Sequence, residues 1–411
     1  MRLLKKTLIA VGILVLLKVI LILLDKYSPH SILFHRNLIT SLQLFCFGWL
    51  VLGLIMGLIF RHDPRRANRV TWIVLLVMVA VLEGLFFYWM RNPSKIPSSL
   101  FASFKEYYIH HHRNIVQVER NCSEYDSAFF YRLRANNSCV FSNIEFSNTI
   151  QTNSRGLRDD EASLAQPNII CIGDSYTMGW GVQQDETYPA RLEKLTGQKV
   201  LNAGMSSFGT IRELRQFAQL DTSNCRWVVL QYCDNDMQEV KPYLDSGYRL
   251  QTSNAAAYDT LVRRSEWNHG YYPGKTFFTV GMFRIKESIK KFTRKGTPEY
   301  AVQLGAGQQV TMPESAKLFA ETLRQSAPLF TNRSLIVLYA FEGGRKDTVF
   351  TRHLQQLLAT SPYKEAFTNP VYIVNASTLL TTNDNYLLDD HYRASGHEKI
   401  AAAIAAIIRG R

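Results

Sequence analysis

Four short segments of the sequence carry side chains that together could perform acyl transfer. Ser175 follows one apolar run, Gly204 and Asn235 follow the next two, and Asp389 and His391 lie near the carboxyl terminus. A serine hydroxyl becomes a nucleophile when a histidine accepts its proton, and a carboxylate orients that histidine. Backbone N–H and amide groups stabilise the oxyanion that forms on the attacked carbonyl. The residue types therefore indicate serine-dependent ester chemistry.

These segments can cooperate only if the fold brings them together. From residue 167 onward, short β-rich runs alternate with amphipathic helical patterns, which predicts a parallel sheet with helices on both faces. The predicted strands are 168–173, 199–203, 227–232, 334–341 and 371–375. The predicted helices are 188–195, 211–220, 313–329, 348–359 and 395–408. In a doubly wound sheet the ligand site lies beyond the carboxyl ends of the strands, which is where the four segments begin.

Each segment alone has a simpler explanation. Gly-Asp-Ser is a common turn sequence, and a single histidine before a helix is usually a surface residue. Four segments after strand ends, in one chain order, favour a shared site instead. A second histidine nearby, His397, is expected to cap or pack the last helix rather than join the chemistry.

The motifs resemble those of the SGNH (GDSL) hydrolase superfamily over residues 153–408. The resembling positions are Gly173-Asp174-Ser175, Gly204, Asn235 and Asp389-x-His391, and the segment NSRGLRDDE resembles the start of this region in membrane-linked members. The resemblance implies a doubly wound α/β/α sandwich with a five-stranded parallel sheet. It also implies that Ser175 is the nucleophile, that His391 and Asp389 are base and acid, and that Gly204 and Asn235 form the oxyanion hole. It implies no metal or other cofactor.

Two positions depart from the family pattern. The third block usually begins with glycine, whereas this chain has Cys233 there. The family's acid often lies three residues before the histidine, where this chain has Leu388. Asp389 is preferred as the acid because membrane-linked relatives often show Asp-x-His, and Asp390 is the alternative.

Three apolar stretches, at residues 8–24, 38–60 and 70–90, are long enough to cross a bilayer, which takes about 20 helical residues. Basic residues precede the first stretch and crowd the loop between the other two, at Arg61, Arg65, Arg66 and Arg69. The positive-inside rule then predicts a cytoplasmic N-terminus and an extracytoplasmic or periplasmic chain from residue 91 onward. We therefore expect a multi-pass protein of the plasma (inner) membrane.

Two charged residues within these stretches need a partner. Lys18 and Glu83 would each cost about 2.5 to 3.5 kcal/mol at the bilayer centre if they stood alone. Both lie about two helical turns before the outer end of their stretch, so they are expected at similar depth, facing each other. The alternative is that Lys18 reaches the outer surface alone while Glu83 is protonated.

The predicted domains are a three-span anchor (1–90), a connecting segment (91–166) and a catalytic domain (167–411) with an insertion at 240–312. Substrate selection is expected in the insertion. Its segment 277–295 alternates apolar and basic residues, and it either covers the insertion or lies on an anionic bilayer surface. Three adjacent histidines, 110–112, are expected on a solvated face.

The cysteines fall into two groups. Cys46, Cys171, Cys225 and Cys233 lie in or beside apolar runs and are expected to be packing residues. Cys122 and Cys139 occupy a polar stretch on the side of the membrane where disulfides persist, and they are the one plausible pair. Two unpaired thiols are the alternative.

Composition limits the function classes. The chain has 411 residues, of which 46% are hydrophobic and 20% charged, which excludes disorder throughout. Its net charge of +13 is explained in part by the membrane-flanking arginines, and no nucleic-acid module, P-loop or dinucleotide fingerprint occurs.

We therefore expect a membrane-anchored serine ester hydrolase acting on O-acyl groups of an envelope glycan or lipid. One alternative is an O-acyltransferase with the same acyl-serine intermediate and a multispan membrane partner. The other is a non-catalytic envelope binding module that has kept the fold. No nucleic-acid partner is expected.

Overall fold

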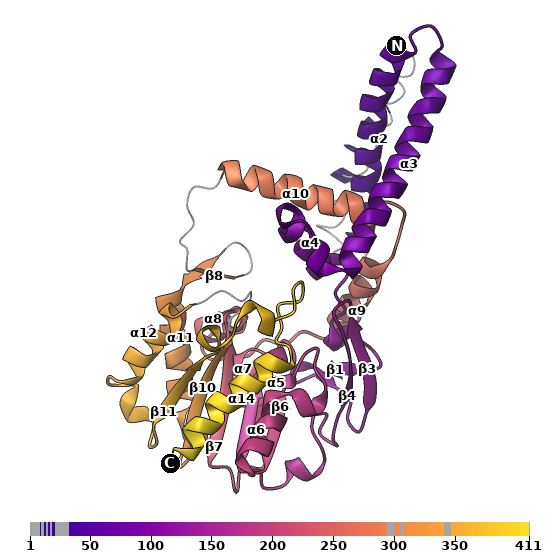
Figure 1. Ribbon diagram of the computed structural model, residues 1–411. Coiled ribbons are helices and arrows are strands. Elements are labelled where there is room, and N and C mark those ends of the chain that lie inside the picture. Colours follow the sequence, from indigo (N-terminus) through magenta and orange to yellow (C-terminus); the bar gives the residue numbers. More distant parts are fainter. Residues whose placement is uncertain are drawn as a thin grey trace. The chain divides into compact units, whose positions relative to one another are not determined.

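The computed structural model describes residues 33–293, 301–304, 308–340 and 347–410, with a few isolated positions between 9 and 20. The chain divides into two compact units, each built from separate stretches. One comprises Met1–Arg113 and Asp259–Arg294, and the other comprises Asn114–Tyr258 and Lys295–Arg411. The first unit thus takes in part of the expected connecting segment and part of the expected insertion. Figure 1 labels the elements of both units.

Two long apolar helices dominate the first unit. They are α2 (Leu33–Ile59) and α3 (Pro64–Arg91), and both are long and apolar enough to cross a membrane. Helix α3 begins where Asp63 accepts a hydrogen bond from the Arg66 N–H at 3.0 Å and Pro64 occupies the first turn. The other expected span, residues 8–24, lies almost wholly outside the described residues. Two membrane-length helices, rather than three, are therefore seen in the described part of the chain.

The described residues of this unit also include α4 (Ser98–His111), most of α9 (Ala255–His269) and α10 (Lys275–Thr293). Helix α10 packs against α2, α3 and α4. The Glu83 carboxylate of α3 accepts the Thr276 N–H at 3.1 Å and the Phe277 N–H at 2.8 Å, in the first turn of α10. Lys18 lies outside the described residues, so its pairing with Glu83 stays a prediction. The sequence did not predict that Glu83 binds the α10 N-terminus.

The second unit contains a five-stranded parallel sheet in the order β11-β10-β7-β5-β6. The strands are β5 (Ile169–Gly173), β6 (Val200–Gly204), β7 (Trp227–Cys233), β10 (Ser334–Ala340) and β11 (Val371–Asn375). The four strands from β10 to β6 are buried at every residue, as expected for strands covered on both faces. The predicted α/β class and parallel sheet are confirmed, and strand ends differ from the predicted ones by at most one residue.

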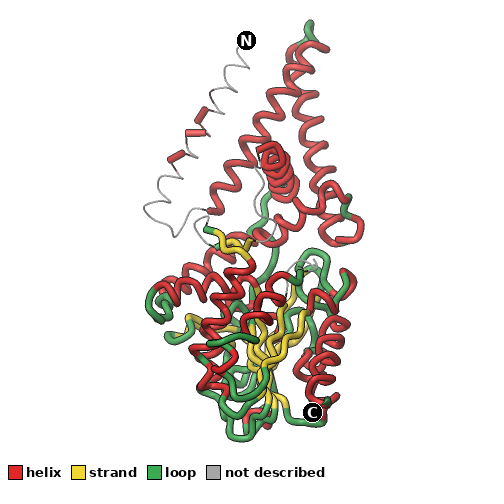
Figure 2. Tube along the Cα trace, turned by 90° about the vertical axis from the view of Figure 1, so that its left-hand side faces the viewer, coloured by secondary structure: helices red, strands yellow, loops and turns green. Residues whose placement is uncertain are grey.

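Helices cover both faces of this sheet (Figures 1 and 2). Helices α6 (Tyr188–Thr196) and α14 (Ala394–Arg409) contact each other, and their Leu192 and Ile400 pack with Val229 of β7 in one buried core. Helices α11 (Met312–Gln325) and α12 (Val349–Leu358) pack together near the other face, where Phe319 and Phe350 lie 4.4 Å and 4.5 Å from the Tyr232 ring. This unit also contains α5 (Ser175–Met178), α7 (Thr210–Phe217), α8 (Met237–Asp245), α13 (Ala376–Leu379) and the pair β8 (Ala301–Gln303) and β9 (Gln309–Thr311).

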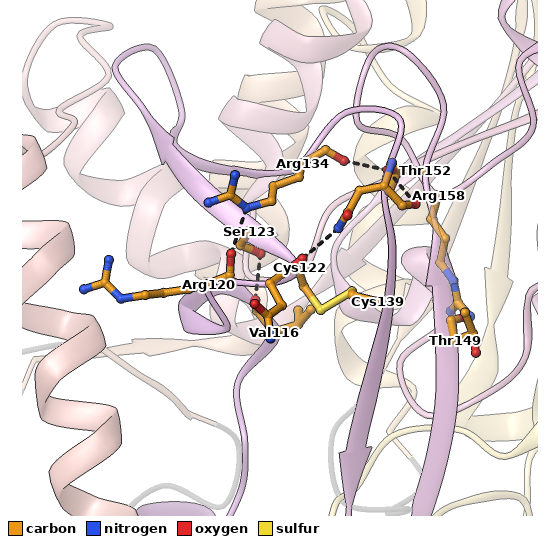
Figure 3. The surroundings of a disulfide bond; sticks show 11 residues. Val116, Arg120, Cys122, Ser123, Arg134, Cys139, Thr149, Thr152 and Arg158 are labelled. Carbon is orange, nitrogen blue, oxygen red and sulfur yellow. Dashed lines mark hydrogen bonds between the residues drawn. A yellow bond between two sulfur atoms is a disulfide. The ribbon is translucent and has the colours of Figure 1, made fainter.

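Two β-hairpins precede the sheet, where the sequence predicted only a connecting segment. They are β1 (Ser123–Asp126) with β2 (Phe130–Leu133), and β3 (Ser138–Asn143) with β4 (Phe146–Gln151). The predicted bridge between Cys122 and Cys139 is present, with Cα atoms 5.5 Å apart, and it ties the start of β1 to β3 (Figure 3). Cys171, Cys225 and Cys233 are buried and form no disulfide, as expected of packing residues.

Candidate active site

A sharp turn after β5 presents Ser175. Gly173 ends the strand at a point with no room for a side chain, because an added Cβ would lie 2.1 Å from the Thr177 Oγ1 atom. Asp174 then caps α5 by accepting the Tyr176 N–H at 2.9 Å, and its own N–H donates to Gln231 of β7 at 2.9 Å. Ser175 is thereby fixed at the first position of α5, with only 8% of its surface exposed.

Ser175, His391 and Asp389 form a continuous hydrogen-bonded relay. The Ser175 Oγ atom lies 2.7 Å from His391 Nε2, and His391 Nδ1 lies 2.5 Å from Asp389 Oδ1. The Asp389 side chain is fully buried, so its carboxylate is shielded from water. These distances suit a serine that donates to the imidazole and an imidazole Nδ1–H that donates to the carboxylate. The carboxylate that lies against the imidazole is that of Asp389, whereas the alternative acid, Asp390, follows it with a left-handed backbone and a φ of 69°.

Aromatic rings hold the His391 imidazole in this orientation. The Trp180 ring stacks on it at 4.7 Å with an interplanar angle of 16°, and the Tyr176 ring lies at 4.9 Å. Trp180 is itself packed edge-on against Phe141 of β3, with ring centroids 4.7 Å apart, and lies 6.3 Å from Phe146 of β4. The hairpin β3–β4 therefore supports the surface on which the imidazole rests.

The structure does not leave Gly204 free for the predicted oxyanion hole. Its N–H donates to the Asn202 side-chain oxygen at 3.0 Å, so that donor is already engaged. A Cβ at this position would lie only 2.3 Å from the Met178 backbone nitrogen. Gly204 is therefore required for the close approach of β6 to α5. The structure corrects the expectation that the Gly204 N–H binds the oxyanion, because that N–H donates to Asn202.

Asn235 and a residue that the sequence did not single out, Ser207, line one cavity of about 520 Å³. Asn235 is exposed in the turn directly after β7. Ser207 has a φ of 57°, which is uncommon for a residue other than glycine, and its N–H has no hydrogen-bond acceptor among the described residues. Ser207 was not predicted because the left-handed conformation at this position belongs to a serine and not to a glycine.

Two buried acids lie behind the turn that carries Asn235. The Asp236 carboxylate accepts from the Thr210 hydroxyl at 2.9 Å and from the Cys233 N–H at 3.3 Å, which fixes the turn. Burial, together with the Asp236 and Asp174 carboxyls, holds the pKa of Glu213 well above its ordinary value. Burial and the Asp174 carboxyl likewise raise the pKa of Asp236. This acidic pair was not predicted from the sequence.

A buried arginine, Arg158, supports the other side of the nucleophile turn. Its guanidinium donates to the backbone oxygens of Met178 at 3.2 Å, Val182 at 2.7 Å and Thr149 at 3.0 Å, and also to that of Gly179. Burial lowers its pKa to about 10. Arg158 thus ties β4 to the loop after α5, and Figure 3 shows it beside Thr149. The segment NSRGLRDDE contains this residue, but its type alone did not reveal the role.

The described residues contain no group of three or more side chains arranged to hold a metal ion.

His397 takes no part in the relay. Its Nδ1 atom accepts the Tyr188 N–H at 3.1 Å, at the start of α6. Its ring also stacks on the Tyr188 ring, with centroids 6.2 Å apart. His397 is a packing residue between α6 and α14, as the sequence predicted.

No family model and no curated protein sequence matches the chain. Similar solved structures include one described as a lipolytic protein of the G-D-S-L family from Desulfitobacterium hafniense DCB-2, at 12% identity, with a TM-score of 0.29 and coverage of 58% of this chain and 98% of that chain. Acetylxylan esterase Axe2 from Geobacillus stearothermophilus is similar at 15% identity, with a TM-score of 0.31 and coverage of 59% and 94%. Acetyl xylan esterase Est2A from Butyrivibrio proteoclasticus is similar at 11% identity, with a TM-score of 0.31 and coverage of 59% and 63%.

The strand order and the hydrogen bonds described above, rather than these likenesses, define the candidate site.

Proposed function

We propose that this protein is a membrane-anchored serine esterase that acts outside the cytoplasm on O-acyl groups of an envelope glycan or lipid. The observation that supports this best is the relay from Ser175 through His391 to Asp389, with distances of 2.7 Å and 2.5 Å. A non-catalytic module would have no need of a complete relay. The buried carboxylate keeps Nδ1 protonated, which leaves Nε2 as the proton acceptor for the serine.

In the proposed reaction, Ser175 Oγ forms a bond to the ester carbonyl carbon while His391 accepts its proton. The tetrahedral intermediate collapses, the bond to the alcohol oxygen breaks, and His391 gives the proton to the leaving alcohol. Water then attacks the acyl-serine with His391 again acting as the base, which releases the carboxylic acid and restores the serine. All bonds and protons in this reaction are accounted for without a cofactor.

The oxyanion in this mechanism needs donors other than the Gly204 N–H. We assign the Asn235 side-chain amide and the Ser207 backbone N–H to this role, because both line the same cavity beyond the sheet edge. Preorganised donors of this kind are each worth roughly 2.7 to 4 kcal/mol of transition-state stabilisation.

The proposed location rests on three features of the described chain. Helices α2 and α3 are long and apolar enough to cross a bilayer. Four arginines lie in the turn between them and in the first turns of α3, at Arg61, Arg65, Arg66 and Arg69, which favours retention of this end on the cytoplasmic side. Residues such as Leu58 and Val81 are 79% and 63% exposed, as expected for side chains that face lipid. The disulfide of Cys122 and Cys139 suits an oxidising compartment.

The test is ester hydrolysis by the full-length protein in detergent micelles. We expect turnover of short-chain aryl esters, lost in Ser175→Ala and retained in Ser223→Ala, whose serine is exposed beyond α7. Addition of candidate glycan acceptors separates hydrolysis from transfer, since a transferase would pass the acyl group to the glycan faster than to water. An unchanged rate in Ser175→Ala would remove the proposed mechanism.

A further inference from the structure

One carboxylate outside the relay is bound to the loop that carries the relay acid. Glu145 lies in the turn between β3 and β4, more than 240 residues before that loop in the sequence. Its Oε1 atom accepts the Leu387 N–H at 2.8 Å. Its Oε2 atom accepts the Leu388 N–H at 2.7 Å and the Asp389 N–H at 3.1 Å. Three consecutive backbone N–H groups are therefore directed at a single side chain.

We infer that Glu145 is a positioning residue for the active site, which holds the backbone of Asp389 so that its carboxylate stays on the His391 imidazole. This inference rests on the proposed function for its catalytic meaning. The Glu145 carboxylate binds the backbone N–H groups of residues 387–389 and acts on the relay through that loop.

The loop that carries Asp389 has no helix or strand of its own to hold its backbone in place. Residues 387–390 lie outside any helix or strand. Asp390, between the relay acid and the histidine, has a φ of 69°, a conformation that a non-glycine residue keeps only when its surroundings enforce it. The Tyr386 N–H donates to the His391 carbonyl at 2.9 Å and closes the base of the loop. Glu145 is the group that fixes the amides inside it.

Hydrogen bonds to an ionised acceptor are about twice as strong as neutral ones, which suits this role. Burial raises the pKa of Glu145, and the Asp389 carboxyl adds to that shift, while the three backbone N–H groups lower it. The loop amides thus offset the cost of holding a second carboxyl close to Asp389. Replacing Glu145 by a neutral side chain removes the strong acceptor from the loop.

The hairpin also contacts this loop and its surroundings through aromatic rings. The Phe146 ring, next to Glu145, lies 5.2 Å from the Tyr386 ring, and the Tyr386 hydroxyl donates to the Gly181 carbonyl at 2.7 Å. Phe146 also lies 6.3 Å from Trp180, the ring that stacks on His391. The hairpin β3–β4 therefore supports the imidazole through Trp180 and the acid through Glu145.

The experiment compares Glu145→Ala, Glu145→Gln and a control variant of the full-length protein in detergent micelles. The control is Glu161→Ala, because the exposed Glu161 carboxylate also binds a loop, accepting the Ser154 N–H at 2.8 Å and the Ser154 hydroxyl at 2.6 Å. Three quantities are measured: kcat and KM for an aryl ester, the rate at which a fluorophosphonate probe labels Ser175, and the low-field proton resonance of the His391 Nδ1–H.

We expect kcat to fall about 100-fold in Glu145→Ala, in line with the cost of a displacement of about 1 Å at a catalytic group, with KM changed less than about twofold. Glu145→Gln keeps one oxygen acceptor and the shape of the side chain, so its kcat should fall only about 10-fold. Probe labelling should slow in parallel with kcat. The low-field resonance should be lost or broadened in Glu145→Ala and unchanged in Glu161→Ala.

The low-field resonance distinguishes a failure of this inference from a failure of the proposed esterase function. If the native protein shows the resonance but no esterase activity, and Glu145→Ala loses the resonance, the esterase proposal fails while the positioning role of Glu145 holds. If Glu145→Ala and Glu145→Gln keep the resonance, the labelling rate and kcat of the native protein, the inference is overturned. It is also overturned if the native protein shows no such resonance. Should Glu145→Ala fail to fold, Glu145→Gln decides alone.

Discussion

The sheet edge and the hairpin β3–β4 contribute to the candidate site in different ways. Loops beyond the strand ends supply the reactive groups, Ser175, His391 and Asp389, whereas the hairpin supplies none of them. The hairpin instead binds the loop of the acid through Glu145 and supports Trp180, on which the imidazole stacks. Reactivity and orientation therefore come from separate parts of the chain, and substitutions in the two parts should have different consequences.

The largest effect is expected at the relay acid. Asp389→Asn should keep the fold but lower kcat by roughly 10⁴-fold, because an amide favours the wrong imidazole tautomer. Asp390→Asn should change kcat little, since the carboxylate that lies 2.5 Å from the His391 Nδ1 atom belongs to Asp389. Steady-state kinetics of the two variants decide which aspartate orients His391. A larger loss in Asp390→Asn would reverse the assignment.

Two variants should distinguish a residue that stabilises the oxyanion from one that is needed for packing. Asn235→Ala should lower kcat by roughly 10² to 10³, with the unfolding midpoint unchanged, because one exposed donor is lost. Gly204→Ala should mainly lower the free energy of unfolding, because its Cβ would lie 2.3 Å from the Met178 nitrogen. Denaturant titration beside kinetics measures both quantities. Full stability in Gly204→Ala would contradict the packing role of Gly204.

The disulfide of the hairpin region should affect the free energy of unfolding more than the rate. Removing the bridge in Cys122→Ala/Cys139→Ala should cost about 3 kcal/mol of unfolding free energy in the chain-entropy model, since the two cysteines are 17 residues apart. Each single variant should cost nearly as much as the double one, because either substitution breaks the same bond. Additive losses, measured by urea unfolding, would show that the bridge contributes little.

The smallest effect is expected from Glu213, whose pKa is raised by burial from an ordinary value of 4.5. Between that value and the higher pKa of the folded state, the folded protein holds a proton that the unfolded chain has lost. Stability therefore falls as the pH rises above 4.5, by at most about 1.4 kcal/mol per pH unit. Glu213→Gln should flatten this dependence between pH 5 and 6, as read from urea unfolding at the two pH values. A slope equal to that of the native protein would contradict the raised pKa.

Sequence patterns predicted the sheet well because each buried strand is a continuous apolar run followed by an amphipathic helix. All five strands and the residues of the relay follow from that alternation and from the family motifs. The hairpins were missed because their strands are short and mix polar with apolar residues, as in β1 (Ser123–Asp126). A polar stretch of this kind is equally typical of a loop.

The supporting contacts could not be predicted for a different reason. Glu145 and Arg158 bind backbone groups, which every residue possesses, so no residue type in the target segment marks the contact. The error at Gly204 has the same origin. The sequence shows a glycine but not whether its N–H is engaged, and Ser207 adopts a left-handed conformation that its residue type does not favour.

The contact between Glu83 and the first turn of α10 has a consequence for the order of synthesis. The carboxylate and the Thr276 N–H are 193 residues apart in the chain. At roughly 5 to 20 residues per second, the ribosome adds the second partner about 10 to 40 s after the first. During that interval the ribosome completes α3 and makes strands β1 to β7, while α10 does not yet exist. The helical unit is therefore begun first and completed only after much of the other unit's sheet has been synthesised.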